Sequence, residues 1–265
     1  MTDDPPVPPP GEPPDSGEDG MSFLDHLEEL RGVLFKSLIA FAIGVGVVVS
    51  LLGNVTDALN WPLVRGYGSV DLATQNLITT GVFEIFTVLL QVCFLGGLVL
   101  SFPFILYFVA TFIAPALTPK EKGVLVPGCF AAFGLFLLGA SFGYFLILPA
   151  AITISVKFNQ LLETQLLWRA GDYYGSVVWL TLLVGAAFQF PLVVVLLAYL
   201  DIVTPQKLRD NRRLVFVIVL LTAALITPGG DPITLLLLAG PLYGLYEIAI
   251  LVAERIVRRK PASPE

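Results

Sequence analysis

The chain has 265 residues, of which 56% are hydrophobic and 14% charged, and its mean hydropathy is +0.84. These values exclude an ordinary soluble domain and predict an integral membrane protein. The net charge of −6 is no sign of a basic partner, because six of the 21 acidic residues lie between positions 3 and 19. The remainder is near neutral, so we expect no nucleic-acid partner.

Residues 1–20 consist of proline, glycine and acidic residues with almost nothing to bury. This composition predicts a disordered tail. The stretch lacks the basic region and cleavage site of a signal peptide. We expect a membrane domain over 21–258 and a second short tail at 259–265.

Six apolar runs follow, and we expect an all-α membrane protein with six transmembrane helices. The runs cover 33–53, 83–113, 124–149, 173–200, 214–227 and 233–253. The last two are short, and the fifth reaches only about 21 Å as a helix, less than the hydrocarbon thickness. Four prolines are predicted to break helices: Pro62, Pro103, Pro191 and Pro228.

Basic residues predict the orientation. Of the 15 Lys and Arg residues, twelve flank the side that holds both termini, and only Arg65, Lys157 and Arg169 flank the other. This asymmetry predicts cytoplasmic termini in the inner, cytoplasmic membrane. The outer face then carries 54–82 and 150–172, and the second of these has an amphipathic pattern suited to lying at the membrane interface.

The stretch "SFLDHLEELRGVL" precedes the first span. Ser22 and Asp25 have the spacing of a capping box, so a helix is expected to begin here. Leucines at 27, 30 and 34 share one stripe with Phe23, which can lie on the membrane or on neighbouring spans, and Glu29 faces the other way.

The two adjacent glutamates of this stretch differ in their expected partners. Glu28 has Arg31 three residues ahead, whereas Glu29 has no basic residue three or four positions away. Glu29 is therefore either part of a solvated face or a site for a cation from elsewhere, and the charge pattern leaves both open.

Several motifs resemble the TatC family, the signal-recognition subunit of the twin-arginine protein translocase. They are "FLDHLEELR", "FIAPALTPKEK", "FQFPLVVVLL", "ITPGGDP" and "GPLYGLYEIAI", in this order. The resemblance runs from about Ser22 to Arg258. It implies binding of signal peptides with two consecutive arginines and export of folded proteins driven by the proton-motive force. It further implies single-span partners of the TatA and TatB types, contact with membrane lipid, and a receptor complex holding several copies of the chain.

By these motifs, the carboxylates that contact the two arginines correspond to Glu29 and Glu121. We place Arg31 and Leu34, on the same helix as Glu29, in the same signal-peptide site. The family often has a glutamate where this chain has Gln189, which hydrogen-bonds but does not titrate near neutral pH.

Two polar residues within the expected spans call for a role, because ionisable and amide groups are costly in hydrocarbon. Glu247 lies in the last span, too far from Arg255 for direct contact. Gln189 precedes Phe190 and Pro191, and a proline at 191 frees the carbonyl of Ala187. We expect Gln189 and Glu247 to form membrane-buried polar positions.

Other functional classes fit less well. A small-molecule secondary transporter is the alternative that the proline-broken spans allow, but it calls for inverted repeats and midplane charge. An intramembrane protease needs a catalytic pair such as Ser/His or two Asp inside the spans. The single histidine, His26, argues against nucleophilic and HExxH zinc centres, and the two cysteines lie in separate apolar runs. We expect no enzymatic activity, no cofactor and no metal.

Overall fold

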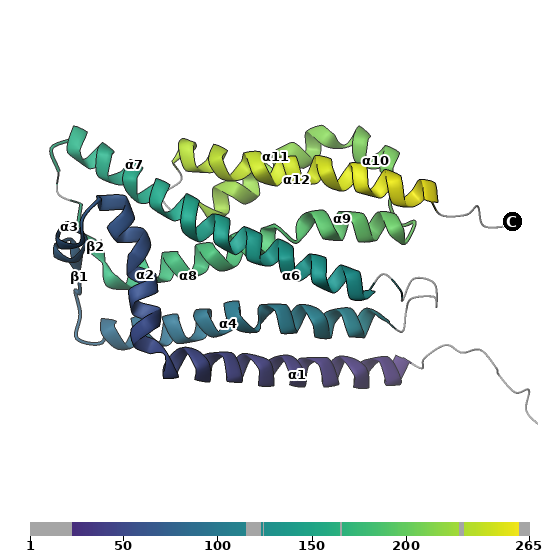
Figure 1. Cartoon of the computed structure of the whole chain (residues 1–265), viewed down its shortest axis with the longest axis horizontal. Helices are drawn as coiled ribbons and strands as arrows, with labels where there is room; N and C mark the ends of the chain where they lie inside the picture. The colour runs from purple at the N-terminus through teal and green to yellow at the C-terminus, as the bar shows by residue number, and fades with distance from the viewer. Residues whose placement is uncertain (1–22, 115–122, 124, 165, 228–230, 260–265) are drawn as a thin grey trace, which may run out of the picture.

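A computed structural model describes residues 23–114, 123, 125–164, 166–227 and 231–259. The long helices lie side by side along one axis, and α1 begins at the same end of the bundle at which α12 ends (Figure 1). We call this the termini end. The opposite end, which carries α2, α3 and the last turns of α7, is the cap end. Residues 1–20 and 260–265 lie outside the described residues, and Arg259 belongs to α12.

The first two long helices form a tight antiparallel pair. Helix α1 (Phe23–Ser50) packs along α4 (Glu84–Ile113). Two glycines set their separation: a Cβ atom on Gly97 would lie 2.6 Å from Val45 Cγ2, and one on Gly44 would lie 2.6 Å from the Gly97 carbonyl oxygen. Small residues allow such close backbone approach in membrane helices.

Short elements build the cap between α1 and α4: α2 (Leu52–Tyr67), α3 (Val70–Gln75) and β1 (Leu77–Ile78). Helix α2 ends at Gly68, whose φ of 80° is the left-handed geometry that glycine adopts freely. Strand β1 pairs in parallel with β2 (Trp168–Arg169), with Leu77 opposite Trp168. The pair fastens two connections that are far apart in sequence.

The third long element is one continuous helix. It comprises α6 (Leu125–Phe142), a π-helical turn η2 (Gly143–Ile147) and α7 (Leu148–Leu161). Pro149 cannot donate to the carbonyl of Phe145, and the helix widens into the π turn here and continues. Residues 150–161 thus extend the helix and pack on α2, which differs from the expected separate amphipathic segment at the interface.

The last third of the chain contains one interrupted helix and one hairpin. Helices α8 (Ala170–Ala187) and α9 (Phe190–Tyr199) are separated at Phe188 and Gln189. Helix α10 (Pro205–Asp210) starts at a Thr204 cap and leads into α11 (Arg212–Ile226), which runs antiparallel to α12 (Pro232–Arg259) (Figure 1).

The four prolines occupy different positions relative to the helices. Pro191 stands in the first turn of α9 and breaks the span as predicted. The prediction is wrong for Pro62 and Pro103, which lie inside the continuous helices α2 and α4. An internal proline removes one backbone hydrogen bond, and packing against neighbouring helices compensates for this loss, so a helix can continue through a proline. Pro228 lies outside the described residues.

Five helices in the described part of the chain are long and apolar enough to cross a membrane: His26–Ser50, Glu84–Ile113, Leu125–Leu161, Ala170–Tyr199 and Pro232–Val257. The expected fifth span, α11, has only 15 residues, about 22 Å of helix. The expectation of a short last span is wrong, because α12 has 28 residues and extends beyond the apolar run at both ends.

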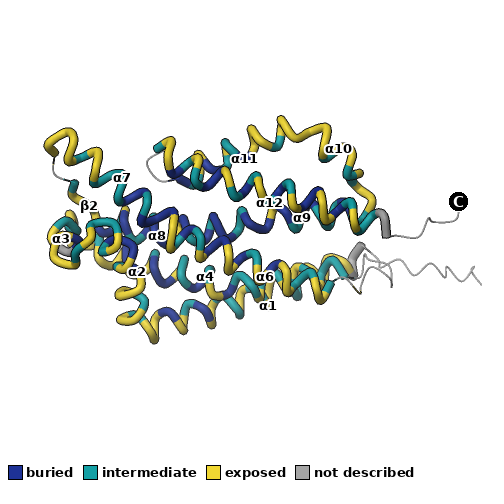
Figure 2. Tube along the Cα trace, turned by 45° about the horizontal axis from the view of Figure 1, so that its top comes forward, coloured by how far each residue is buried: buried dark blue, intermediate teal, exposed yellow. Residues whose placement is uncertain are grey.

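Burial follows the helix order. Buried residues gather where α8 meets α4 and α6, around Tyr173, Val184 and Phe188, whereas α1 is exposed along one side (Figure 2). The exposed side of α1 is strongly apolar and includes Leu34, which is 63% exposed, and Phe35, which is 65% exposed. Such a face suits contact with lipid chains.

Candidate functional site

The predicted signal-peptide site starts from Glu29, in the second turn of α1. The structure turns Glu29 towards the bundle and leaves the leucine stripe outside, with Leu27 and Leu30 exposed. Along α1, Glu29 is in helical register with Val33, Ser37, Gly44 and Val48, which are half-buried or buried. The carboxylate therefore sits at the termini end of the face that packs against α4.

One oxygen of this carboxylate is buried without a partner. Glu29 Oε2 accepts no hydrogen bond from any described residue, and no described Lys or Arg lies within ion-pair distance of it. A buried carboxylate oxygen without a donor is costly, so the site is suited to receive a cationic or N–H donor.

Glu121 lies outside the described residues, in the segment that follows α4 in the sequence. His26 stacks on Phe112, the penultimate residue of α4, with ring centroids 4.4 Å apart. The residues from 114 to 124 join the end of α4 to α6. The start of α1 and the end of α4 thus lie together at the termini end.

The other residues of this predicted site are exposed. Arg31 and Leu34 point away from the packed face of α1. The predicted ion pair between Glu28 and Arg31 is absent from the ion pairs of the described residues, so that prediction is wrong. Both side chains are exposed, and a solvated i, i+3 pair gains only a few tenths of a kcal/mol, roughly 0.2–0.5, from contact.

Gln189 lies at the break between α8 and α9, 9% exposed, and it lines a cavity of about 240 Å³ among α4, α6, α9 and α12. Its Nε2 atom donates to the carbonyl of Ala132 in α6 at 2.9 Å. Its Oε1 atom is buried and accepts no hydrogen bond from a described residue. The rest of the lining is almost wholly apolar, including Leu106 and Leu192, so the expected polar position at 189 is a single amide in an apolar cavity.

Glu247 occupies a separate place, between α11 and α12. Its Oε2 atom lies 2.8 Å from the Arg212 guanidinium, and its Oε1 atom accepts a hydrogen bond from Tyr243 at 3.0 Å. A second ion pair, Arg209 with Glu254 at 2.6 Å, joins α10 to α12. Gln189 and Glu247 therefore do not form one polar site, and Glu247 fastens the hairpin.

Reasoning within single helices missed Arg212 as the partner of Glu247. The signal was available in the sequence, because residues at nearly equal sequence distances from a tight turn face each other in an antiparallel hairpin. Arg212 and Glu247 are nearly equally far in sequence from the turn at residues 228–230. The same holds, less closely, for Arg209 and Glu254.

The structure separates the basic residues as the orientation argument required. Lys207, Arg209 and Arg212 lie on α10 and the start of α11, at the termini end (Figure 1). Arg65 and Lys157 lie on α2 and α7, at the cap end. The two ends of the bundle thus differ in basic charge.

Comparisons with known proteins agree on one family. A family model described as "TatC: Sec-independent protein translocase protein (TatC)" matches residues 25–241. The chain is 35% identical to the "Sec-independent protein translocase protein TatC" of Aquifex aeolicus, over 91% of this chain and 98% of that protein. It is 36% identical to the chloroplastic TATC of Pisum sativum, over 88% of this chain and 63% of that protein.

A solved structure has the same fold. The "Crystal Structure of Twin Arginine Translocase Receptor- TatC" superposes with a TM-score of 0.74 at 34% identity and covers 88% of this chain and 100% of that chain. These matches confirm the resemblance that the motifs indicated. The chain belongs to the TatC family of Sec-independent protein translocase proteins.

Proposed function

We propose that this chain is the twin-arginine signal-peptide receptor of its translocase, and that Glu29 and Glu121 receive the two arginine side chains. Membership of the TatC family makes it a subunit of a Sec-independent protein translocase, a transport protein and not an enzyme. The secondary-transporter alternative finds no support among its relatives. Transport of folded precursors, driven by the proton-motive force, is the corresponding activity.

The observation that carries the proposal is the buried, unpartnered Oε2 atom of Glu29 at the termini end of α1. A fully exposed Arg–carboxylate pair is typically worth under about 1 kcal/mol, too little to select a peptide. A partly buried carboxylate gains more from a guanidinium, which supplies two parallel N–H donors in fixed geometry. Lysine offers a single point charge and should bind less well.

The orientation belongs to the same proposal. We place the termini end in the cytoplasm and the cap end outside, in the cytoplasmic membrane. Support comes from the excess of basic residues at the termini end and from the return of α12 to the end where α1 begins (Figure 1). With α11 as a short sixth crossing, the number of spans is even. TatA- and TatB-type subunits and further copies of the chain are the proposed partners.

Site-specific crosslinking to a signal peptide tests the receptor role. A photoreactive residue beside the Arg-Arg pair should crosslink to the wild-type chain and much less to Glu29→Gln or Glu121→Gln, at equal protein level in the membrane. Glu28→Gln is the matched control, because Glu28 is the adjacent carboxylate on the exposed side of α1. Crosslinking that survives in the Glu29→Gln, Glu121→Gln double variant would show that these carboxylates are only a solvated face.

A further inference from the structure

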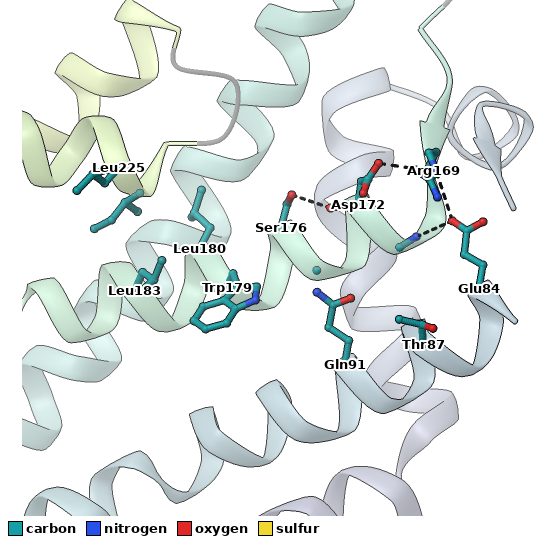
Figure 3. A pocket seen from close by; sticks show the side chains of 13 residues that line it. Glu84, Thr87, Gln91, Arg169, Asp172, Ser176, Trp179, Leu180, Leu183 and Leu225 are labelled. Carbon is teal, nitrogen blue, oxygen red and sulfur yellow. Dashed lines mark hydrogen bonds and ion pairs between the residues drawn. The ribbon is translucent and has the colours of Figure 1, made fainter. Parts of the chain in front are cut away.

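The short hairpin leaves a notch near the cap end, between α4 and α8. Helix α11 has only 15 residues, so it does not cover the cap-end part of the α4–α8 pair. Its last residues, Leu225 and Ile226, line the notch together with residues of α4 and α8. The notch has a volume of about 580 Å³ (Figure 3). It lies at the opposite end of the bundle from Glu29 and does not contain Gln189.

The rim of this cap-end notch is charged. Glu84, at the start of α4, accepts hydrogen bonds from Thr80, from the Gly81 amide and from the Gly171 amide. Its carboxylate therefore joins the segment before α4 to the first turn of α8. Arg169 lies alongside, with its Nε atom 3.8 Å from Glu84 Oε1 and 4.0 Å from Asp172 Oδ2 (Figure 3).

Arg169 holds its two ion pairs only at 3.8 and 4.0 Å, so its guanidinium N–H donors remain available. Its guanidinium makes no hydrogen bond to a described residue, and its side chain is 56% exposed. The pairing of β1 with β2 fixes its backbone, as does the neighbouring Trp168, whose indole donates to the Tyr67 hydroxyl at 3.2 Å. Burial raises the pKa of Tyr67, so this hydroxyl stays protonated and donates to the Leu166 carbonyl.

Deeper in the notch lies one amide. Gln91 is seven residues, about 10 Å, along α4 from Glu84, and its carboxamide makes no hydrogen bond within the described part of the chain. Gly175 makes room for it, since a Cβ atom there would overlap Gln91 Nε2. The Gln91 side chain is half-buried and lines the notch, so a ligand there could accept a hydrogen bond from its amide.

The wall of the notch furthest from the charged rim is apolar and exposed. Trp179 is 45% exposed and Leu225 is 86% exposed. The notch presents three kinds of surface in order: a charged rim, a single amide and an exposed apolar wall. This order matches the groups of a phospholipid, which are phosphate, ester carbonyl and acyl chain. A soluble anion would use only the rim, and an apolar peptide helix would leave Arg169 and Gln91 without partners.

We propose that the cap-end notch binds one membrane phospholipid with an amine-bearing headgroup. The Arg169 guanidinium takes the phosphate, and the Asp172 carboxylate, whose side chain is 70% exposed, takes the ammonium group. Gln91 donates to an ester carbonyl, and one acyl chain lies along Trp179 and Leu225. The site is independent of signal-peptide recognition, because it shares no residue with the predicted Glu29 site.

Native mass spectrometry of the purified full chain tests this site with phosphatidylethanolamine as the probe. The wild-type chain should retain one lipid. Retention should fall about tenfold in Arg169→Gln, the loss expected when a charge-assisted contact is removed. Gln91→Leu should lower it as well. The matched control is Arg65→Gln, which removes a cap-end arginine outside the notch.

Two further arms separate the possible ligands. Phosphatidylglycerol with the same chains should be retained less than phosphatidylethanolamine, and Asp172→Asn should abolish that preference. Inorganic phosphate should not displace the lipid. Equal retention in wild type, Arg169→Gln and Gln91→Leu, with unchanged thermal unfolding, would overturn the proposal. Displacement by inorganic phosphate alone would also overturn it, because the site would then be an anion site.

Discussion

His26, in the first turn of α1, stacks on Phe112 near the end of α4, with ring centroids 4.4 Å apart. The two helices meet here at the termini end, where the carboxylate of Glu29 turns inwards. The contact therefore joins the start of α1, which carries Glu29, to the last turn of α4.

Cysteine crosslinking tests this contact. In a chain whose native Cys93 and Cys129 are replaced by alanine, His26→Cys with Phe112→Cys should form a disulfide on mild oxidation, because stacked rings bring the two positions into range. Leu27→Cys with Phe112→Cys is the control, since the exposed Leu27 is turned about 100° around α1 from His26. Equal disulfide formation in both pairs would place the start of α1 elsewhere.

The crossing of α1 and α4 should tolerate no added methyl group at Gly97. Its Cβ atom would lie 2.6 Å from Val45 Cγ2 and 2.8 Å from the Val45 nitrogen, and overpacking of this kind costs about 1–3 kcal/mol. Gly97→Ala should therefore lower the thermal unfolding midpoint of the detergent-solubilised chain. Gly46→Ala, where nothing lies within 4 Å, should leave it nearly unchanged. Equal midpoints for the two variants would contradict the packing described.

Topology can be measured with an impermeant thiol reagent on intact cells. Cysteines introduced singly at Ser16 and Ser263 should stay unlabelled, whereas one at Ser69, in the cap, should react. The expectation rests on the twelve-to-three division of basic residues. Labelling at either terminus, or none at Ser69, would reverse or break the proposed orientation.

Periodicity and composition predict the part of this fold that depends on single segments of the chain. Long apolar runs located the spans because crossing hydrocarbon needs a helix of fixed minimum length. The continuous helices through Pro62 and Pro103, and the extension of α6 into α7, depend on packing against other helices, which local propensity does not report. The missing helical partner of Glu29 could be read from the sequence, whereas the Arg212–Glu247 pair and the cap-end notch join residues from different helices.

The hairpin pair should respond to charge reversal. Arg212→Glu places a carboxylate against Glu247, which Tyr243 also contacts, and should destabilise the packing of α11 on α12. The double variant Arg212→Glu, Glu247→Arg should recover much of the loss in thermal unfolding, because it restores an ion pair across the hairpin. Arg213→Glu is the control, as Arg213 is exposed and forms no ion pair with the described residues. Failure of the double variant to improve on the single one would show that the pair is not what fastens the hairpin.

Gln189 offers the last test, of a neutral hydrogen-bonding group in a membrane cavity. Its Nε2 atom donates to the Ala132 carbonyl across the α6–α9 contact, and leucine would remove this hydrogen bond while filling similar space. We expect Gln189→Leu to lower the export of a twin-arginine precursor with the protein still folded in the membrane. Gln189→Glu should be tolerated, because glutamate is close to glutamine in size and its protonated carboxyl group can donate to the Ala132 carbonyl in place of the amide. Export rates measured at matched membrane levels distinguish the cases. Wild-type export from Gln189→Leu would reduce Gln189 to a packing residue, and loss of export from Gln189→Glu alone would show that the cavity admits no acid.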